Sequence, residues 1–187
     1  MRYVFDKGVS RFTVQAFATG MLSVFGHDPT IAIRDYEGEV QFVPGTYDKA
    51  LLRVSVNTAT FEVLDEMKRD DREKLEALML GNVLDVEHFP DVLFESKQVS
   101  VRKVSDDLLQ ASVIGDLTLR GVTQSLSFEA RVMDMGTMLR ISGGFTLRQS
   151  DFGIKPVSFA GGSLRLKDEL KFSFELVGKQ EEVVVEA

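Results

Sequence analysis

Few side chains in this 187-residue sequence have the chemistry that catalysis requires, and its two histidines are the first candidates. His27 lies in Phe25-Gly26-His27-Asp28-Pro29, a loop sequence in which the imidazole could act as an acid or base beside Asp28. The same loop could instead be an ordinary turn in which Asp28 binds the ring, or a polar contact at the mouth of a pocket. His88 precedes a strand in Glu87-His88-Phe89-Pro90 and is expected on the surface.

Composition excludes several kinds of catalytic and metal centre. Without cysteine, the chain has no thiolate nucleophile, disulfide, zinc finger or iron–sulfur site. Two histidines cannot form a three-histidine site, and no H-E-x-x-H, G-x-S-x-G or phosphate-binding glycine loop occurs. The acidic pairs Asp70-Asp71 and Asp106-Asp107 lie in charged stretches that are typical of solvated surface. We therefore expect no metal, no other cofactor and no catalytic residue.

Charge and hydropathy limit the partners. The 29 acidic residues outnumber the 22 basic ones, so the chain has no basic stripe for a phosphate backbone, and nucleic acid is not an expected partner. No apolar run approaches the ~18 residues that span a bilayer, which predicts no stable membrane insertion. Residues 1–8 include Arg2, Asp6 and Lys7 and do not lead into the apolar run of a secretory signal, so a cytoplasmic location is expected.

Alternating apolar and polar residues dominate the chain and must form the scaffold of any site. The pattern is clearest from Leu164 to Leu176, where Asp168 is the exception on the apolar side. Turn sequences such as Pro44-Gly45 and Met135-Gly136 separate the other alternating stretches, which are residues 12–16, 40–42, 52–56, 92–94, 113–119, 126–132 and 139–147. About eight strands of this kind predict an all-β antiparallel fold. Closure into a barrel is favoured because it leaves no exposed strand edge.

One segment has a helical period instead. From Asp65 to Leu80, apolar residues such as Met67 and Leu75 recur at helical intervals among charged residues, which predicts one amphipathic helix. We expect this helix to end at Gly81 in a left-handed C-cap. It could plug an open end of the barrel, or it could be a movable lid.

The length of the chain predicts a single domain. We assign residues 1–178 to one barrel domain and residues 179–187 to a C-terminal tail. The tail begins with Lys179-Gln180-Glu181-Glu182 and continues with Val183-Val184-Val185. It is either disordered or a late strand that docks on a partner.

Phenylalanine is the most distinctive part of the composition, with 14 Phe against 3 Tyr and no Trp. Half of these rings occupy the apolar phase of their strands and would converge inside a barrel: Phe12, Phe42, Phe94, Phe128, Phe145, Phe172 and Phe174. They offer apolar contact without a hydrogen-bonding group. The rings could fill the interior themselves, which the pattern alone favours, or leave a dry tunnel for a chain-like apolar ligand.

Several motifs, taken in order, resemble the YceI-like family of lipid-binding proteins. The most specific match is Gly115-Asp116-Leu117-Thr118-Leu119-Arg120-Gly121-Val122-Thr123, which is close to the family's G-x-L-T-I-R-G-V-T signature. Phe89-Pro90-Asp91-Val92-Leu93-Phe94-Glu95-Ser96 matches the family's F/Y-P-x-I-x-F-x-S strand entry, and Arg148-Gln149-Ser150-Asp151-Phe152-Gly153-Ile154 resembles R-x-D-F-G-I. Residues 18–27 match the family's S-x-V-x-G-x-F loop only loosely. The resemblance covers most of the chain, from about Arg2 to Leu176.

This resemblance implies a lipocalin-like, extended antiparallel β-barrel that holds a polyisoprenoid chain or a quinone tail, often as a homodimer. It favours the tunnel over the filled core. Many members of the family carry a signal peptide, which residues 1–8 do not resemble, so the ligand and partners of this chain could differ from theirs. The family contributes no catalytic residue to the interpretation.

The leading hypothesis is non-enzymatic binding of one long isoprenoid-like lipid inside the barrel. The seven phenylalanines are the expected lining, and His27, Arg69 and Arg120 are the expected polar groups near an opening. One alternative is an enzyme that holds an apolar substrate in the barrel, with His27 and Asp28 at its mouth. Another is a filled barrel that serves protein–protein assembly, in which Val183-Val184-Val185 adds a strand across a two-fold axis.

Overall fold

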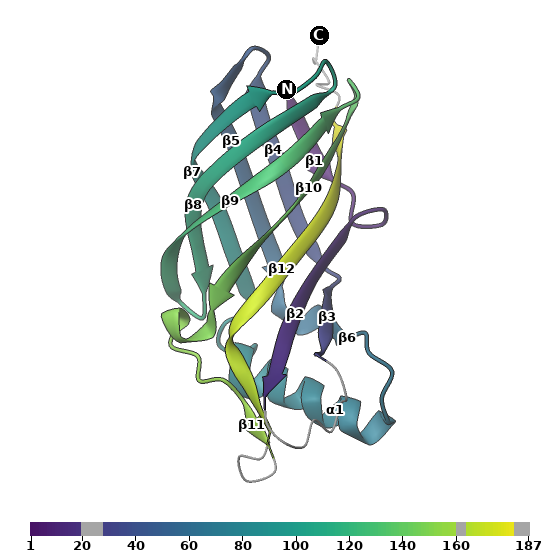
Figure 1. Cartoon of the computed structure of the whole chain (residues 1–187), viewed down its shortest axis with the longest axis vertical. Helices are drawn as coiled ribbons and strands as arrows, with labels where there is room; N and C mark the ends of the chain where they lie inside the picture. The colour runs from purple at the N-terminus through teal and green to yellow at the C-terminus, as the bar shows by residue number, and fades with distance from the viewer. Residues whose placement is uncertain (20–27, 160–163, 182–187) are drawn as a thin grey trace.

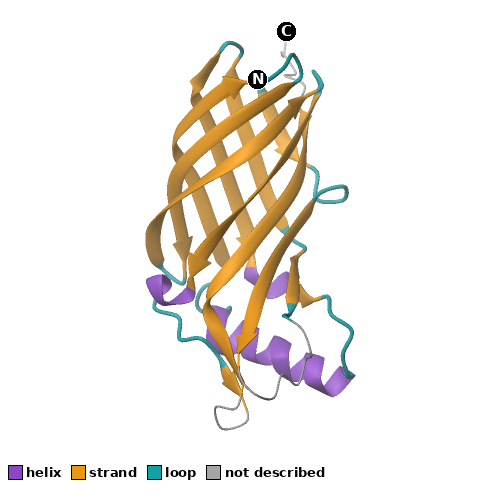
Figure 2. Ribbon diagram, viewed as in Figure 1, coloured by secondary structure: helices purple, strands orange, loops and turns teal. Residues whose placement is uncertain are grey.

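The chain folds into an antiparallel β-barrel, seen from the side in Figures 1 and 2; the computed structural model describes residues 1–19, 28–159 and 164–181. Each strand of the ring pairs with the next, and the last strand, β12, closes the ring by pairing with the first, β1. In ring order the strands are β1 (Arg2–Phe5), β4 (Tyr36–Val43), β5 (Thr46–Asn57), β7 (Asp91–Lys103), β8 (Leu108–Leu119), β9 (Val122–Asp134), β10 (Met138–Arg148) and β12 (Leu164–Gln180). The predicted all-β barrel is confirmed.

Two strands in succession cover one edge of β12. β1 pairs with its last residues, and β2 (Arg11–Thr19) pairs with the remainder, followed outward by β3 (Thr30–Ile33) and β6 (Phe61–Val63). Ser10 bridges the break between β1 and β2: its hydroxyl donates to the Asp6 carbonyl at 2.7 Å and accepts the Val177 N–H at 2.9 Å. Backbone groups at the break are therefore satisfied by a side chain where no strand partner is available.

The helices lie at one end of the barrel and the hairpin turns lie at the other (Figure 2). The helical end contains α1 (Arg69–Leu78), the π-helical turn η2 (Met79–Leu84), the short turns η1 (Thr58–Thr60) and η3 (Gln149–Phe152), and the short strand β11 (Ser158–Phe159). At the opposite end, tight turns connect β4 to β5, β7 to β8 and β9 to β10 (Figure 1).

The predicted amphipathic helix is present, but its expected end at Gly81 is wrong. The helical chain continues through Gly81 as η2, and Asp85 adopts the left-handed conformation at φ 52°. The continuation has a packing reason: Leu84, at the end of η2, is buried against a cluster that includes Leu117 and Leu119. Burial of an apolar side chain here outweighs the usual preference of a helix to end at glycine.

Polar contacts fix α1 under the barrel. The Arg72 guanidinium donates to the carbonyls of Val63 and Asp65, and the Glu76 carboxylate accepts the Val63 N–H at 3.1 Å. Leu75 is buried on the side of the helix that faces the interior. In this position the helix acts as a plug, while its movement as a lid stays a prediction.

The predicted strand phasing is confirmed across the barrel wall, with register shifts in β4, β7 and β12. The register of β12 against β2 shifts between Leu166 and Leu170, the segment that contains Asp168. The Asp168 carboxylate turns to η3, where it accepts the Ser150 N–H at 2.8 Å and the Ser150 hydroxyl at 2.5 Å. An acidic residue on the apolar phase is thus tolerated because it caps a neighbouring turn.

The C-terminal strand extends beyond the predicted domain boundary. β12 reaches Gln180, which pairs with Tyr3, and the Glu181 carboxylate forms an ion pair with Arg2. Val183-Val184-Val185 lies outside the described residues. Among the described residues, no helix has the length and hydropathy needed to cross a membrane.

Candidate binding cavity

An internal cavity of about 250 Å³ occupies the barrel, so the barrel is not completely filled. Its lining extends from Leu75 in α1, at the helical end, to Asp134 beside the β9–β10 turn, so the cavity follows the barrel's long axis. Apart from Tyr47, Asp134 and Gln149, every lining residue is apolar. Such a wall can bind hydrocarbon, but it offers few groups that could bind a polar ligand.

All seven phenylalanines predicted to face inward line this cavity: Phe12, Phe42, Phe94, Phe128, Phe145, Phe172 and Phe174. Most of them join in one network of ring contacts. Phe145 and Phe172 stack with their centroids 4.7 Å apart, and Phe128 contacts Phe145 and Phe174 at 5.7 Å. Phe94 extends the network to β7, 5.7 Å from Phe128. The network stiffens one wall of the cavity.

Phe128, Phe145 and Phe172 form a belt across β9, β10 and β12, and a row of small residues lies next to it on the hairpin side. In that row Ala130 pairs with Ala111 on one neighbouring strand and with Gly143 on the other. Small side chains beside large ones leave space between the walls of a barrel. We refer to Ala111, Ala130 and Gly143 as the small-residue row.

Phenylalanine rings lie against three inward-facing glycines, Gly38, Gly115 and Gly143, at distances that leave no room for a Cβ atom. A Cβ atom at Gly143 would lie 2.7 Å from both the Phe174 ring and the Glu129 carbonyl oxygen. At Gly115 it would lie 2.6 Å from the Phe94 ring. These distances are too short for any side chain. Each glycine therefore allows a phenylalanine ring from a neighbouring strand to pack directly over its backbone.

The hairpin end of the cavity is aromatic with a polar margin. Tyr3 stacks on Phe42 with centroids 5.7 Å apart, and Phe42 contacts Tyr47 at 5.3 Å. The Tyr3 hydroxyl donates to the Gly136 carbonyl at 2.6 Å, and burial raises the pKa of this phenol. A second cavity of about 200 Å³ adjoins this end and shares Tyr47 and Asp134 with the first. The main cavity therefore approaches the surface between the hairpins.

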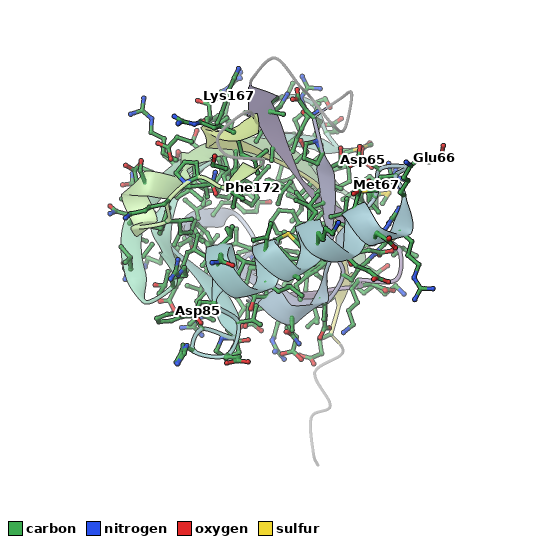
Figure 3. The ribbon with its side chains drawn as sticks, turned by 90° about the horizontal axis from the view of Figure 1, so that it is seen from below. Asp65, Glu66, Met67, Asp85, Lys167 and Phe172 are labelled. Atoms are coloured by element: carbon green, nitrogen blue, oxygen red, sulfur yellow. The ribbon has the colours of Figure 1, made fainter. Side chains whose placement is uncertain are left out.

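The helical end is more completely covered. Figure 3, viewed from this end, shows α1 crossing the opening, with Phe172 inside the ring of strands and Asp85 and Lys167 at its outer margin. Leu75, Leu78 and Met79 contribute the helical part of the lining. Gln149 is the polar exception here; it is 2% exposed and its amide donates to the Lys167 carbonyl at 3.0 Å. One N–H of the Gln149 side-chain amide is therefore bonded to the protein backbone and not free for a ligand.

Two of the three polar groups predicted near an opening, Arg69 and Arg120, can be placed in the structure. Arg69 points to solvent, where it forms an ion pair with Glu73. Arg120 donates to the Asn82 and Val83 carbonyls and lies 3.8 Å from Asp85, so it holds the β8–β9 turn against η2. Neither arginine lines the cavity. His27 lies outside the described residues.

The described residues next to His27 have structural contacts. The Asp28 carboxylate accepts the Ala18 N–H at 2.9 Å, which ties the end of this loop to β2. The other histidine, His88, is exposed as expected and lies 2.8 Å from Asp85, whose carboxylate raises the pKa of the imidazole. Within the described residues, no cluster of three or more His, Asp or Glu side chains could hold a metal ion.

The alternation over residues 126–132 placed Ala130 on the inward phase, but Ala111, Gly143 and the polar lining residues Tyr47, Asp134 and Gln149 were not identified. Ala111 shares the inward phase of Val113, so the same alternation could have indicated it. The positions of Tyr47 and Asp134 beside the opening depend on which hairpins meet at that end, which no single strand specifies.

Comparison with known proteins agrees with this architecture. BcnA of Burkholderia cenocepacia has a similar fold, with a TM-score of 0.70 and 17% sequence identity; the match covers 92% of this chain and 98% of that one. A polyisoprenoid-binding domain from Saccharophagus degradans, implicated in plant cell wall breakdown, has a TM-score of 0.69 and 11% identity. That match covers 96% of this chain and 98% of the domain. At these identities the likeness concerns the fold alone.

Curated sequences give a second comparison. A UPF0312 protein of Pseudomonas paraeruginosa is 29% identical over 127 residues, which cover 65% of this chain and 61% of the relative. Protein YceI of Salmonella arizonae is 29% identical over 136 residues, which cover 72% of this chain and 59% of the relative. The matched part thus spans about three fifths of the length of these relatives. Residues 3–178 match the YceI-like domain family, and the chain therefore belongs to the YceI-like family.

Proposed function

We propose that the barrel binds one long apolar lipid of the isoprenoid type, a polyisoprenoid or the tail of a quinone, and performs no chemistry on it. The observation that carries this proposal is a cavity along the barrel axis with an almost entirely apolar lining. A solved structure with the same fold is described as a polyisoprenoid-binding domain, which supports an isoprenoid as the class of ligand.

Physical chemistry favours a chain-like ligand over a compact polar one. Each CH₂ group moved from water into such a cavity gains about 0.8 kcal/mol, so affinity grows with the length of the chain. The lining offers few hydrogen-bonding groups, and one of them, the Gln149 amide N–H, is already bound to Lys167. A ligand rich in hydroxyl or charged groups would lose its hydration without replacement.

A binding role also agrees with the placement of the titratable groups. No imidazole lines the cavity among the described residues, and the Asp134 carboxylate at its margin accepts the Gly136 N–H at 2.9 Å. The enzyme alternative requires His27 and Asp28 to face the cavity together, and Asp28 is bound to Ala18. A homodimer and a cytoplasmic location remain predictions.

The direct test is to denature the purified protein, extract it with organic solvent and identify any bound lipid by mass spectrometry. We expect one isoprenoid-type molecule per chain. Repeated extraction without a stoichiometric lipid, together with no binding of added long-chain polyprenol in detergent solution, would contradict the proposal.

A matched pair of variants tests whether the cavity is the site. Ala111→Phe adds a ring to the small-residue row, whereas Ile114→Phe adds a ring to the outer face of the same strand, β8. We expect the first variant to lose at least about tenfold in polyprenol affinity, because the ring displaces several CH₂ groups of the ligand. The second should bind as the wild type does. Equal loss in both variants would place the site elsewhere.

A further inference from the structure

Exposed apolar side chains gather around the hairpin end of the barrel. Five of the nine exposed large hydrophobic residues among those described lie there, with 45–61% of their surface accessible: Met1, Val43, Val104, Met133 and Met135. We call these five residues the apolar rim. Val43, Val104 and Met135 each belong to a different hairpin, and all three turns project at the same end in Figure 1.

We infer that the apolar rim docks the barrel on the surface of a lipid bilayer, with the hairpin end facing the membrane. This inference rests on the proposed function, because the lipid that it would admit is the ligand proposed for the cavity. The partner is a bilayer of lipids without net charge, and the rim side chains contact it.

The arrangement of the rim fits a lipid surface better than a protein partner. Val43, Val104 and Met135 lie on three separate turns, Met133 lies beside Met135 at the end of β9, and Met1 precedes β1. The turn between β4 and β5, Val43-Pro44-Gly45-Thr46, carries no charge. A protein partner requires a continuous, complementary face, which separate tips do not provide. Isolated apolar side chains that project from turns can instead enter the boundary between headgroups and acyl chains.

The rim is also continuous with the cavity. Val101, Leu109 and Asp134 line the cavity at this end, and the rim residues Val104, Met133 and Met135 lie on the hairpins that carry them. A long isoprenoid is insoluble in water, so it must pass between bilayer and barrel without crossing the solvent. The apolar rim surrounds the end at which the cavity comes close to the surface, so a docked barrel would meet that requirement.

The opposite end does not have these properties. Among the described residues there, the exposed large hydrophobic side chains are Leu64, on the loop before α1, and Leu93, near the start of β7. α1 presents charged residues such as Arg69 and Glu73 to solvent. The helix also closes the cavity with Leu75, Leu78 and Met79. The hairpin end is therefore the end that a lipid surface would meet.

Charge selects the kind of membrane. Two basic residues beside the rim have acidic partners: Lys103 forms an ion pair with Asp106 at 2.9 Å, and Arg2 forms pairs with Glu39 and Glu181. The whole chain carries a net charge of −7. We expect binding to neutral vesicles to equal or exceed binding to anionic ones, because the net charge opposes approach to a negative surface.

The experiment measures flotation of the protein with phosphatidylcholine vesicles. The test variant is V43S/V104S/M135S, and the control is L93S/I114S, which removes exposed apolar side chains from the outer wall at 49% and 42% exposure. We expect the rim variant to lose at least about tenfold in vesicle affinity, since each substitution removes apolar groups that would be buried in the bilayer. The control should float as the wild type does. Thermal melting of both variants verifies that they are folded.

A second measurement separates docking from ligand binding. Polyprenol is supplied either in detergent solution or in the vesicles, and loading of the barrel is followed by extraction. Loss of loading from vesicles with normal loading from detergent supports the docking role of the rim. Flotation of the rim variant at wild-type level, or flotation that requires phosphatidylserine, would overturn it. Failure of the wild type to load from detergent while it still floats would count against the proposed ligand and leave the docking surface standing.

Discussion

Phe145 on β10 and Phe172 on β12 are directly paired across the sheet, and their rings stack at 4.7 Å with only 8° between their planes. The stack forms part of the cavity wall, so the same two side chains contribute to the stability of the barrel and to the surface that a ligand would contact. Their interaction can be measured apart from their burial.

We expect a double-mutant cycle of Phe145→Leu and Phe172→Leu to give a coupling energy of about 1 kcal/mol, because stacked rings interact beyond their area burial. Urea denaturation of the single and double variants measures it. The control cycle combines Phe145→Leu with Phe42→Leu, which belongs to the separate aromatic contact with Tyr3. A coupling near zero for the stacked pair would show that the two rings act independently.

Gly143→Ala should destabilise the protein by about 2 kcal/mol or more, because the added methyl group overlaps backbone and ring atoms in a packed wall. Gly81→Ala is the control. No atom lies within 4 Å of a Cβ built at Gly81, and its φ is not positive, so alanine should stabilise the helical turn by about 0.5 kcal/mol. The free energy of unfolding of each variant decides the comparison. Tolerance of alanine at Gly143 would contradict the close packing of Phe174.

Asp168 predicts a pH dependence of stability. The hydrogen bonds from the Ser150 hydroxyl and N–H hold the pKa of this carboxyl below its ordinary value of 3.8. The carboxylate therefore stabilises the folded state above the ordinary value, and this contribution is lost as the pH falls through the lowered one. Asp168→Asn should cost about 1 kcal/mol at pH 7, where the carboxylate is charged in both states, and less below pH ~4. A difference from the wild type that does not change with pH would argue against this role.

The two arginines predicted as polar groups should behave differently when replaced. Arg120→Gln removes the contacts to Asn82 and Val83, so we expect it to cost about 1 kcal/mol and to accelerate amide hydrogen exchange in η2. Arg69→Gln changes an exposed ion pair on the same helical segment and should stay within about 0.5 kcal/mol of the wild type. Equal exchange rates in the two variants would show that Arg120 does not hold η2 in place.

Sequence reasoning succeeded where one physical rule acts over many residues. A barrel wall forces alternate residues inward, so Phe128, Phe145 and Phe172 could be placed from their phase alone. The rule fails for β3 and β6, because strands of only four and three residues are too short to show an alternation. It also gives no information on Arg120, whose partners are backbone carbonyls supplied by a distant helical turn.

The end of the helix shows a different limit. Glycine is a common helix terminator, but at Gly81 the deciding contact is made by Leu84 with a strand more than thirty residues away, a tertiary effect of about 1.5–3 kcal/mol for a buried leucine. A local signal worth less than this cannot set the boundary. The same reasoning applies to Asp168, where a partner in η3 determines what the side chain does.

The split edge of β12 has a consequence for biosynthesis. β12 is synthesised after the other strands of the barrel, yet β1 and β2, which are synthesised before them, each pair along one edge with it, as in the contact of Tyr3 with Gln180. Until β12 has been synthesised, these two strands lack this neighbour and expose an edge that can pair with other chains. We expect nascent chains that stop before β12 to depend on chaperones, and a late, slow closing step in refolding of the full chain.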